Sequence, residues 1–173
     1  MRKSLKVVLV LFIFTVVFAA IPALQSKAWA EEFVNKTPHF TVEVPKWNDT
    51  KKNLSPGTVL KRAEDMLELT TLVIMVEDLP ANLTVKDLTP AFIADVERSY
   101  SAKLAEVKYE REIKLKDGTK AYEFEVQWDH PSIRLYTYEV VVFKDKKIVR
   151  VMITTGDPIN DEYKKIPLSL SFK

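Results

Sequence analysis

Five residues at two breaks in the second half of the chain have the side chains for metal chemistry. They are Asp129, His130, Asp157, Asp161 and Glu162. Carboxylates with one imidazole can hold a hard cation such as Ca²⁺ or Mn²⁺, because these ions prefer oxygen ligands. The spacing matches no established ion-binding loop, and acidic residues are also ordinary turn residues. No cofactor is expected beyond such an ion, which requires the fold to bring these groups together.

Lysines gather around two predicted turns, at Asp117-Gly118 and at residues 144–147. They are Lys114, Lys116, Lys120, Lys144, Lys146 and Lys147. If the strands between these turns form a meander, both turns lie at the same end of the sheet. Each lysine near an anionic surface adds roughly 1 kcal/mol of attraction. Lysines at hairpin tips also prevent sheet edges from aggregating, so a partner-binding and a solubilising role both remain open.

Aromatic residues and one arginine are further candidates for partner binding. Arg134, Tyr136 and Tyr138 alternate along one face of a predicted strand, and Trp47 stands in a polar, turn-rich segment. Tyr, Trp and Arg dominate binding hot spots. Aromatic residues in strands also commonly form core, so exposure decides between the two roles.

Composition excludes several function classes. The chain has no cysteine and three glycines, which removes disulfides, thiolate catalysis, glycine-rich nucleotide loops and the Gly-x-Ser-x-Gly elbow. Its two histidines, His39 and His130, lie far apart in sequence. We assign no catalytic residue and expect a protein that is not an enzyme.

The first thirty residues have the pattern of a secretory leader. Arg2, Lys3 and Lys6 precede an apolar run from Val7 to Ile21, and Ala28-Trp29-Ala30 follows it. This order is typical of an exported chain that a signal peptidase cleaves. We therefore predict a signal peptide over 1–30 and one domain over 31–173, located in the periplasm or outside the cell.

An uncleaved anchor is the alternative, because residues 7–24 approach the roughly 18 apolar residues that a membrane span needs. Pro22 and the polar Gln25-Ser26-Lys27 favour cleavage, after which the protein is not an integral membrane protein. Without cleavage it stays membrane-anchored. The leader holds four of the 26 basic residues and none of the 24 acidic ones, so the remainder is slightly acidic and unsuited to nucleic acid.

The periodicity of apolar residues predicts an α+β fold with a twisted antiparallel sheet of about six or seven strands. After a leading arm at 31–38, we expect strands at 40–44, 59–63, 69–76, 107–115, 122–128, 133–143, 148–154 and 168–172, a helix at 90–105 and a short helical turn at 160–166. Tyr122, Phe124, Val126 and Trp128 should share one buried face, because they alternate with polar residues.

This order of elements resembles the PsbP-like family, which includes extrinsic photosystem subunits, Ran-binding Mog proteins and exported bacterial proteins. The resemblance lies in Phe40 to Trp47, Leu72 to Pro80, the hairpin Asp117 to Phe124 and the closing Ser169 to Lys173. It implies an α/β/α sandwich around an antiparallel sheet and a non-enzymatic binding or assembly role. Pro167 departs from the longer helix that the family usually has before its last strand. The resemblance transfers no functional residue.

Three function classes follow. The first is an exported, non-enzymatic binding or assembly module of the cell envelope, whose partner is an envelope protein or an anionic surface. The alternative is a small-ligand or lipid carrier with a pocket between helix and sheet. An enzyme ranks third, because the Ser, His and carboxylate residues form no motif. A cavity of about 300 Å³ or more with converging polar groups would favour the carrier, and a flat, closed surface the module.

Overall fold

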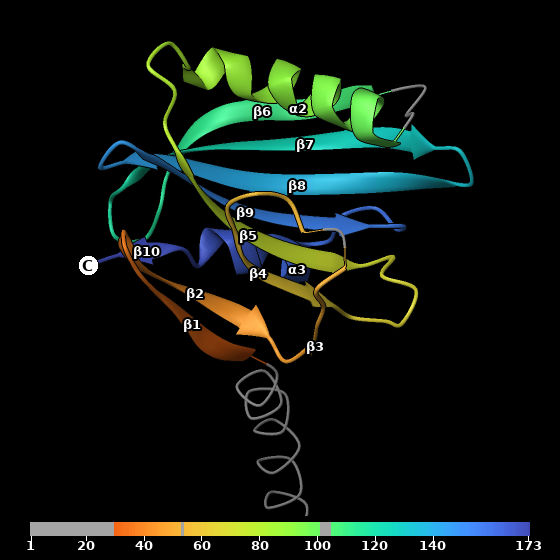
Figure 1. Ribbon diagram of the computed structural model, residues 1–173, viewed down its shortest axis with the longest axis horizontal. Helices are drawn as coiled ribbons and strands as arrows, with labels where there is room; N and C mark the ends of the chain where they lie inside the picture. The colour runs from red at the N-terminus through yellow and green to blue at the C-terminus, as the bar shows by residue number, and fades with distance from the viewer. Residues whose placement is uncertain (1–29, 53, 101–104) are drawn as a thin grey trace, which may run out of the picture.

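The computed structural model describes residues 30–52, 54–100 and 105–173, and its strands form two antiparallel sheets. The strands are β1 (Ala30–Lys36), β2 (His39–Pro45), β3 (Asn48–Asp49), β4 (Thr58–Ala63), β5 (Thr71–Asp78), β6 (Ala105–Lys114), β7 (Lys120–His130), β8 (Ile133–Lys144), β9 (Lys147–Thr155) and β10 (Ser171–Phe172), and the helices are α2 (Val85–Tyr100) and α3 (Asp161–Leu168). The large sheet has the order β3-β4-β5-β9-β8-β7-β6, and the small sheet β1-β2-β10. The α+β fold with its seven-stranded sheet confirms the predicted class (Figure 1).

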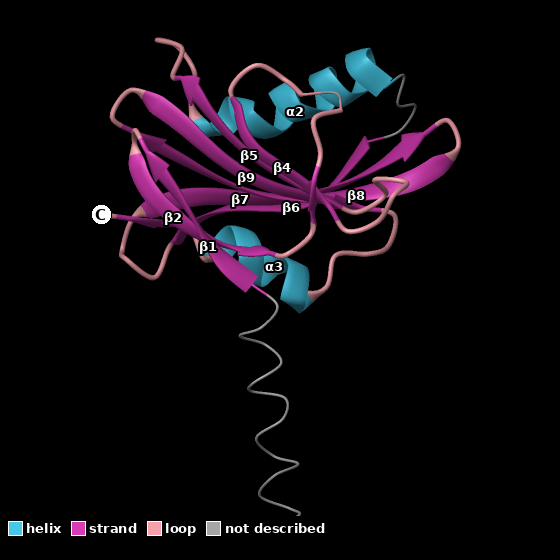
Figure 2. Ribbon diagram, turned by 60° about the horizontal axis from the view of Figure 1, so that its bottom comes forward, coloured by secondary structure: helices cyan, strands magenta, loops and turns pink. Residues whose placement is uncertain are grey.

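The two helices lie on opposite faces of the large sheet, as Figure 2 shows. On one face α2 packs against β6 and β7. On the other face α3 contacts β8, β9 and β2, and the small sheet completes the cover. The predicted leader lies outside the described residues except for Ala30, which opens β1. Within the described ranges no helix is both long and apolar enough to cross a membrane.

The strands β6 to β9 form the predicted meander, in which each strand pairs with the next. The β8–β9 turn has Asp145 and Lys146 at φ 52° and 60°, the left-handed conformation that a two-residue type I′ hairpin turn requires at both central positions. This turn fixes the pairing of Lys144 with Lys147 and hence the register along both strands.

Strand alternation in β7 places Tyr122, Phe124, Val126 and Trp128 on the α2 side, and all four are buried, as predicted. The ring centroids of Phe124 and Phe92 from α2 lie 5.5 Å apart. The polar residues that alternate with them face the other side of the sheet. That side is covered as well, so Glu123 is buried instead of solvated.

Three segments differ from the sequence prediction. The leading arm at 31–38 is largely the strand β1, which pairs along its whole length with β2. The helix α2 starts at Val85 instead of Pro90, and its predicted end at 101–104 lies outside the described residues. The helix α3 continues through Pro167 to Leu168.

The early start of α2 has a local cause. The Thr84 N–H and hydroxyl both donate to the Asp87 carboxylate, at 2.9 and 2.7 Å. This is the reciprocal pattern of a helix N-terminal capping box, in which an acid in the first turn bonds back to the residue before the helix. Pro90 therefore sits inside the helix.

Candidate ligand groove

The face of the large sheet that carries α2 is only partly covered. Because α2 lies over β6 and β7, none of the described helices and strands covers the α2 side of β5 and β9. A groove of about 1150 Å³ runs there, between α2 and the two loops that flank β4, which contribute residues 52, 54–56 and 66–69. We call it the α2 groove. Ligand pockets in proteins commonly have volumes of roughly 300–1,000 Å³, so the α2 groove has room for a small ligand.

The floor of the α2 groove follows from strand alternation and register. Val73 and Met75 of β5 stand opposite Met152 and Arg150 of β9, and all four line the groove. Their neighbours Leu72, Ile74, Val151 and Ile153 point to the other face and are fully buried. Successive residues of β5 and β9 therefore serve two purposes, one face building core and the other building the groove.

Methionines are concentrated in the α2 groove. The chain has four, and the three besides Met1 are Met66, Met75 and Met152, which all line it. Methionine has an unbranched, polarizable side chain that adapts to irregular apolar surfaces. Met66 is 92% exposed and its neighbour Leu67 is 78% exposed at the groove's rim. The lining can therefore adjust to an apolar ligand.

A buried ion pair lies at one end of the floor. The Arg150 guanidinium donates to both carboxylate oxygens of Glu139, with Nη2 3.1 Å from Oε2. Its Nη1 also lies 3.7 Å from Glu77 Oε2. Glu139 is completely buried, and the attraction of its charge raises the pKa of Arg150. Arg150 is thus neutralised by carboxylates of the protein itself.

A chain of hydrogen bonds crosses the floor at the other end. The Trp128 indole N–H donates to Thr137 Oγ1 at 3.0 Å, and the Thr137 and Thr154 hydroxyls bond each other at 3.0 Å. Trp128 and Thr154 both line the groove. This end therefore combines an aromatic surface with polar groups whose hydrogen bonds are satisfied within the protein.

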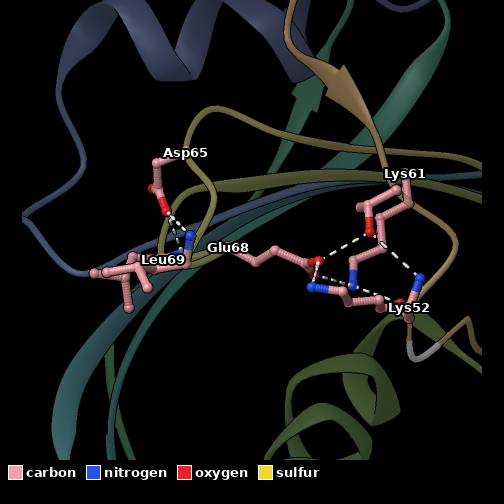
Figure 3. Close-up of polar contacts among 7 residues, drawn as sticks. Lys52, Lys61, Asp65, Glu68 and Leu69 are labelled. Carbon is pink, nitrogen blue, oxygen red and sulfur yellow. Dashed lines mark hydrogen bonds and ion pairs between the residues drawn. The ribbon is translucent and has the colours of Figure 1, made fainter.

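Two lysines share one carboxylate at the rim formed by the loops. Glu68 Oε2 lies 3.1 Å from Lys61 Nζ, and Glu68 Oε1 lies 3.5 Å from Lys52 Nζ (Figure 3). Hydrogen bonds from Lys61 and Thr50 lower the pKa of Glu68. We call Lys52, Lys61 and Glu68 the rim cluster; it carries one net positive charge.

The conformation of the loop that follows β4 is stabilised by the carboxylate of an aspartate within the loop. The Asp65 carboxylate accepts hydrogen bonds from the backbone N–H groups of Leu67, Leu69 and Thr70. Figure 3 shows Asp65 turned toward Leu69. Glu68 adopts a left-handed backbone conformation with φ 56°. These bonds fix the exposed Met66 and Leu67 at the rim.

Two of the five residues of the predicted cation site, Asp129 and Glu162, pair with neighbouring basic side chains. Asp129 pairs with Arg134 at 2.8 Å, and this hydrogen bond lowers the pKa of Asp129. Asp157 is exposed, and Asp161 and Glu162 form the first turn of α3, where Glu162 pairs with Lys165. Among the described residues no group of three or more His, Cys, Asp or Glu side chains is arranged to hold a metal. The Ca²⁺ or Mn²⁺ site, which includes His130, stays a prediction.

The two lysine-bearing turns lie together at one end of the sheet, which we call the lysine end. The Phe172 N–H of β10 donates to Asp117 in the first turn at 2.7 Å, and Lys144 of the second turn lies 4.9 Å from the centroid of the Phe172 ring. Both turns therefore meet at β10. Lys147 pairs with Asp78 at 2.6 Å. Four further lysines are exposed there, namely Lys114, Lys116, Lys120 and Lys146. Their binding of a partner stays a prediction.

Of the three aromatic residues predicted to contact a partner, one belongs to the core and the other two are half-buried. Tyr138 is fully buried and its hydroxyl donates to Glu123, so its predicted contact with a partner is wrong. The reason is that α3 and the small sheet cover this face. Tyr136 is half-buried, and half-buried Trp47 packs edge-on against Tyr163 of α3, with centroids 6.1 Å apart.

Solved structures of other proteins share this fold. Cyanobacterial PsbP from Synechocystis sp. PCC 6803 matches with a TM-score of 0.69 and 14% identity, over 84% of this chain and 94% of that one. The Ran-binding protein Mog1p from Saccharomyces cerevisiae matches with a TM-score of 0.56 and 11% identity, over 83% and 95%. No protein-family model matches the sequence, and no curated protein does. The chain therefore has the PsbP-like fold.

Proposed function

We propose that the protein is an exported, non-enzymatic binding module that holds an apolar ligand in the α2 groove. The observation that carries this proposal is the groove itself, with Met66, Met75 and Met152 in its lining. Adaptable thioether side chains over a wide apolar floor suit binding.

The comparisons support a binding role at the level of the fold. The yeast neighbour is described as a Ran-binding protein, so this fold serves binding in at least one case. The export part of the proposal rests on the leader pattern of residues 1–30. Mass spectrometry of the secreted or periplasmic protein tests it. A mature chain that begins at Glu31 would support export with cleavage, and a full-length species retained in membranes would refute cleavage.

A neutral fluorescent probe tests the groove directly. N-phenyl-1-naphthylamine becomes bright in apolar surroundings, so its titration into the purified protein should show saturable binding. Met152→Lys places a charge in the floor and should weaken binding about tenfold or more, because burying a charge against an apolar ligand is unfavourable.

The matched control is Val34→Lys. Val34 is 47% exposed on β1, which belongs to the small sheet on the opposite side of the large sheet. This variant adds the same charge and should leave the affinity unchanged. Equal affinities of the two variants, or no saturable binding by the unaltered protein, would overturn the proposal.

A second candidate function is docking on an anionic envelope surface through the lysine end. The observation that favours it is the convergence of the two lysine-bearing turns at β10. Sedimentation with vesicles that contain phosphatidylglycerol should pull down the protein. The double variant Lys116→Gln, Lys120→Gln should reduce this, and equal binding to neutral phosphatidylcholine vesicles would refute it.

A further inference from the structure

We infer that the ligand of the α2 groove is an amphiphile with one acyl chain and an anionic head group. This inference rests on the proposed function and specifies its ligand. The acyl chain would lie on the floor over β5 and β9, and the head group would meet the rim cluster of Lys52, Lys61 and Glu68.

The rim cluster has a preformed preference for an anion. Two ammonium groups face one carboxylate, which leaves one positive charge unbalanced. The Lys61 side chain is only 12% exposed and is fixed by its bonds to Glu68 and to the Lys52 carbonyl oxygen at 2.8 Å. The Lys52 side chain is 74% exposed and reaches Glu68 only at 3.5 Å. Lys52 can therefore turn toward a bound head group while Lys61 stays in place.

The far end of the groove disfavours an anion, which fixes the direction of the ligand. Arg150 is already bonded to Glu139 and has Glu77 beside it. Asp95 of α2 lines the same end, where Arg98 pairs with it at 2.7 Å. The four groups Arg150, Glu139, Glu77 and the Asp95–Arg98 pair sum to a negative charge. A carboxylate or phosphate placed there would be repelled, whereas the rim cluster attracts it.

The length of the floor suits one flexible chain. Val73, Met75 and Met152 belong to the adjacent strands β5 and β9, and Leu135 of β8 and Trp128 of β7 continue the apolar lining beside them. Along β5 the lining runs from Thr71 to Glu77, six residue steps that span roughly 20 Å at about 3.3 Å each. The lining is therefore long enough for an extended acyl chain.

Displacement of bound N-phenyl-1-naphthylamine tests this inference. Palmitate and 1-hexadecanol have chains of the same length and differ in head-group charge. Palmitate should displace the probe at about tenfold lower concentration, the effect expected of one charge-assisted hydrogen bond in a partly buried site. Lysophosphatidylglycerol should also outcompete lysophosphatidylcholine. The tighter of palmitate and lysophosphatidylglycerol then identifies whether the natural head group is a carboxylate or a phosphate.

Variants locate the head group. Lys52→Glu and Lys61→Met should each remove most of the palmitate preference, whereas Lys51→Glu changes an exposed neighbour outside the groove and should retain it. Equal displacement by palmitate and 1-hexadecanol, or a preference that survives in Lys52→Glu and Lys61→Met, would overturn the inference and leave the proposed function standing. A failure of the probe to bind at all would refute both.

Discussion

The two faces of the large sheet show how the same strands build a core and a groove. On the face toward α3 the side chains of Leu72, Ile74, Val151 and Ile153 are fully buried under the helix and the small sheet. On the face toward α2 the alternate residues of β5 and β9 line a groove, because the helix lies over β6 and β7. A cover narrower than its sheet therefore leaves an apolar strip open, and that strip is where a ligand has room.

Both faces also bury a carboxylate, and its negative charge is stabilised differently on each face. On the closed face Glu123 accepts hydrogen bonds from the Tyr138 hydroxyl and from Arg111. On the open face Glu139 is paired with Arg150 at the groove floor. Burial and the bond to Glu123 raise the pKa of Tyr138, which keeps its hydroxyl neutral. The closed face thus uses one neutral and one charged donor, and the open face a full ion pair.

The largest expected effect comes from the part of the open face that α2 does cover. Phe124 is completely buried against Phe92. Phe124→Ala should lower the free energy of unfolding by about 3–5 kcal/mol, the usual cost of removing a buried Phe. A denaturant titration measures it. A loss below about 1 kcal/mol would mean that α2 does not seal this region.

Neighbours on β9 give a sharper comparison of the two faces. Ile153 is fully buried on the closed face, and Met152 is half-buried in the groove floor. Ile153→Ala should cost about 2–5 kcal/mol, because it leaves a cavity in a packed core. Met152→Ala should cost less than about 1.5 kcal/mol, since the groove is already open to solvent. Equal losses of stability would contradict the distinction between a closed and an open face.

Acid should loosen the rim cluster. The pKa of Glu68 is lowered from its ordinary value of 4.5 by its bonds to Lys61 and Thr50. A carboxylate whose pKa is lower in the folded than in the unfolded protein stabilises the fold at every pH above its unfolded-state pKa. This stabilisation is lost as the pH falls through the folded-state pKa. Glu68→Gln should therefore be less stable than the unaltered protein at pH 7, by less than about 1 kcal/mol for an ion-pair cluster at the rim of the groove. The difference should shrink as the pH falls below 4.5, the ordinary pKa of a glutamate; a constant difference would show that charge is not its cause.

The smallest expected effect concerns the predicted cation site. If Asp129, His130, Asp157, Asp161 and Glu162 bind Ca²⁺ or Mn²⁺, millimolar cation must raise the thermal midpoint, because a ligand that binds only the folded state stabilises it. The double variant Asp157→Asn, Asp161→Asn should abolish the shift. An unchanged midpoint, or the same shift in the double variant, would leave these residues as ordinary loop acids.

Much of the fold follows from local patterns. The period of two in residues 122–128 predicts the buried face of β7, because alternation leaves one register that buries the aromatic residues. The start of α2 was missed because Pro90 also fits a first helical position. The apolar spacing of Val85, Leu88 and Phe92 and the Thr84–Asp87 pair were the signals for the earlier start.

The groove could not be found in the same way. Met75 and Met152 stand in apolar strands, where nothing local distinguishes a residue that lines a groove from one that lines a core. That distinction depends on where α2 lies across the sheet. The Glu139–Arg150 pair is the exception, since the turn at residues 144–147 sets a register that places these two opposite charges diagonally across β8 and β9.

The most direct test of the α2 groove as the binding site is carbon-13 NMR of the methionine methyl groups. Met66, Met75 and Met152 all line the groove, and Met1 is the chain's only other methionine. Titration with palmitate should shift the methyl signals of Met66, Met75 and Met152 together, to saturation at the same ligand concentration. Signals that stay fixed while the ligand binds would place the binding site elsewhere and contradict this account.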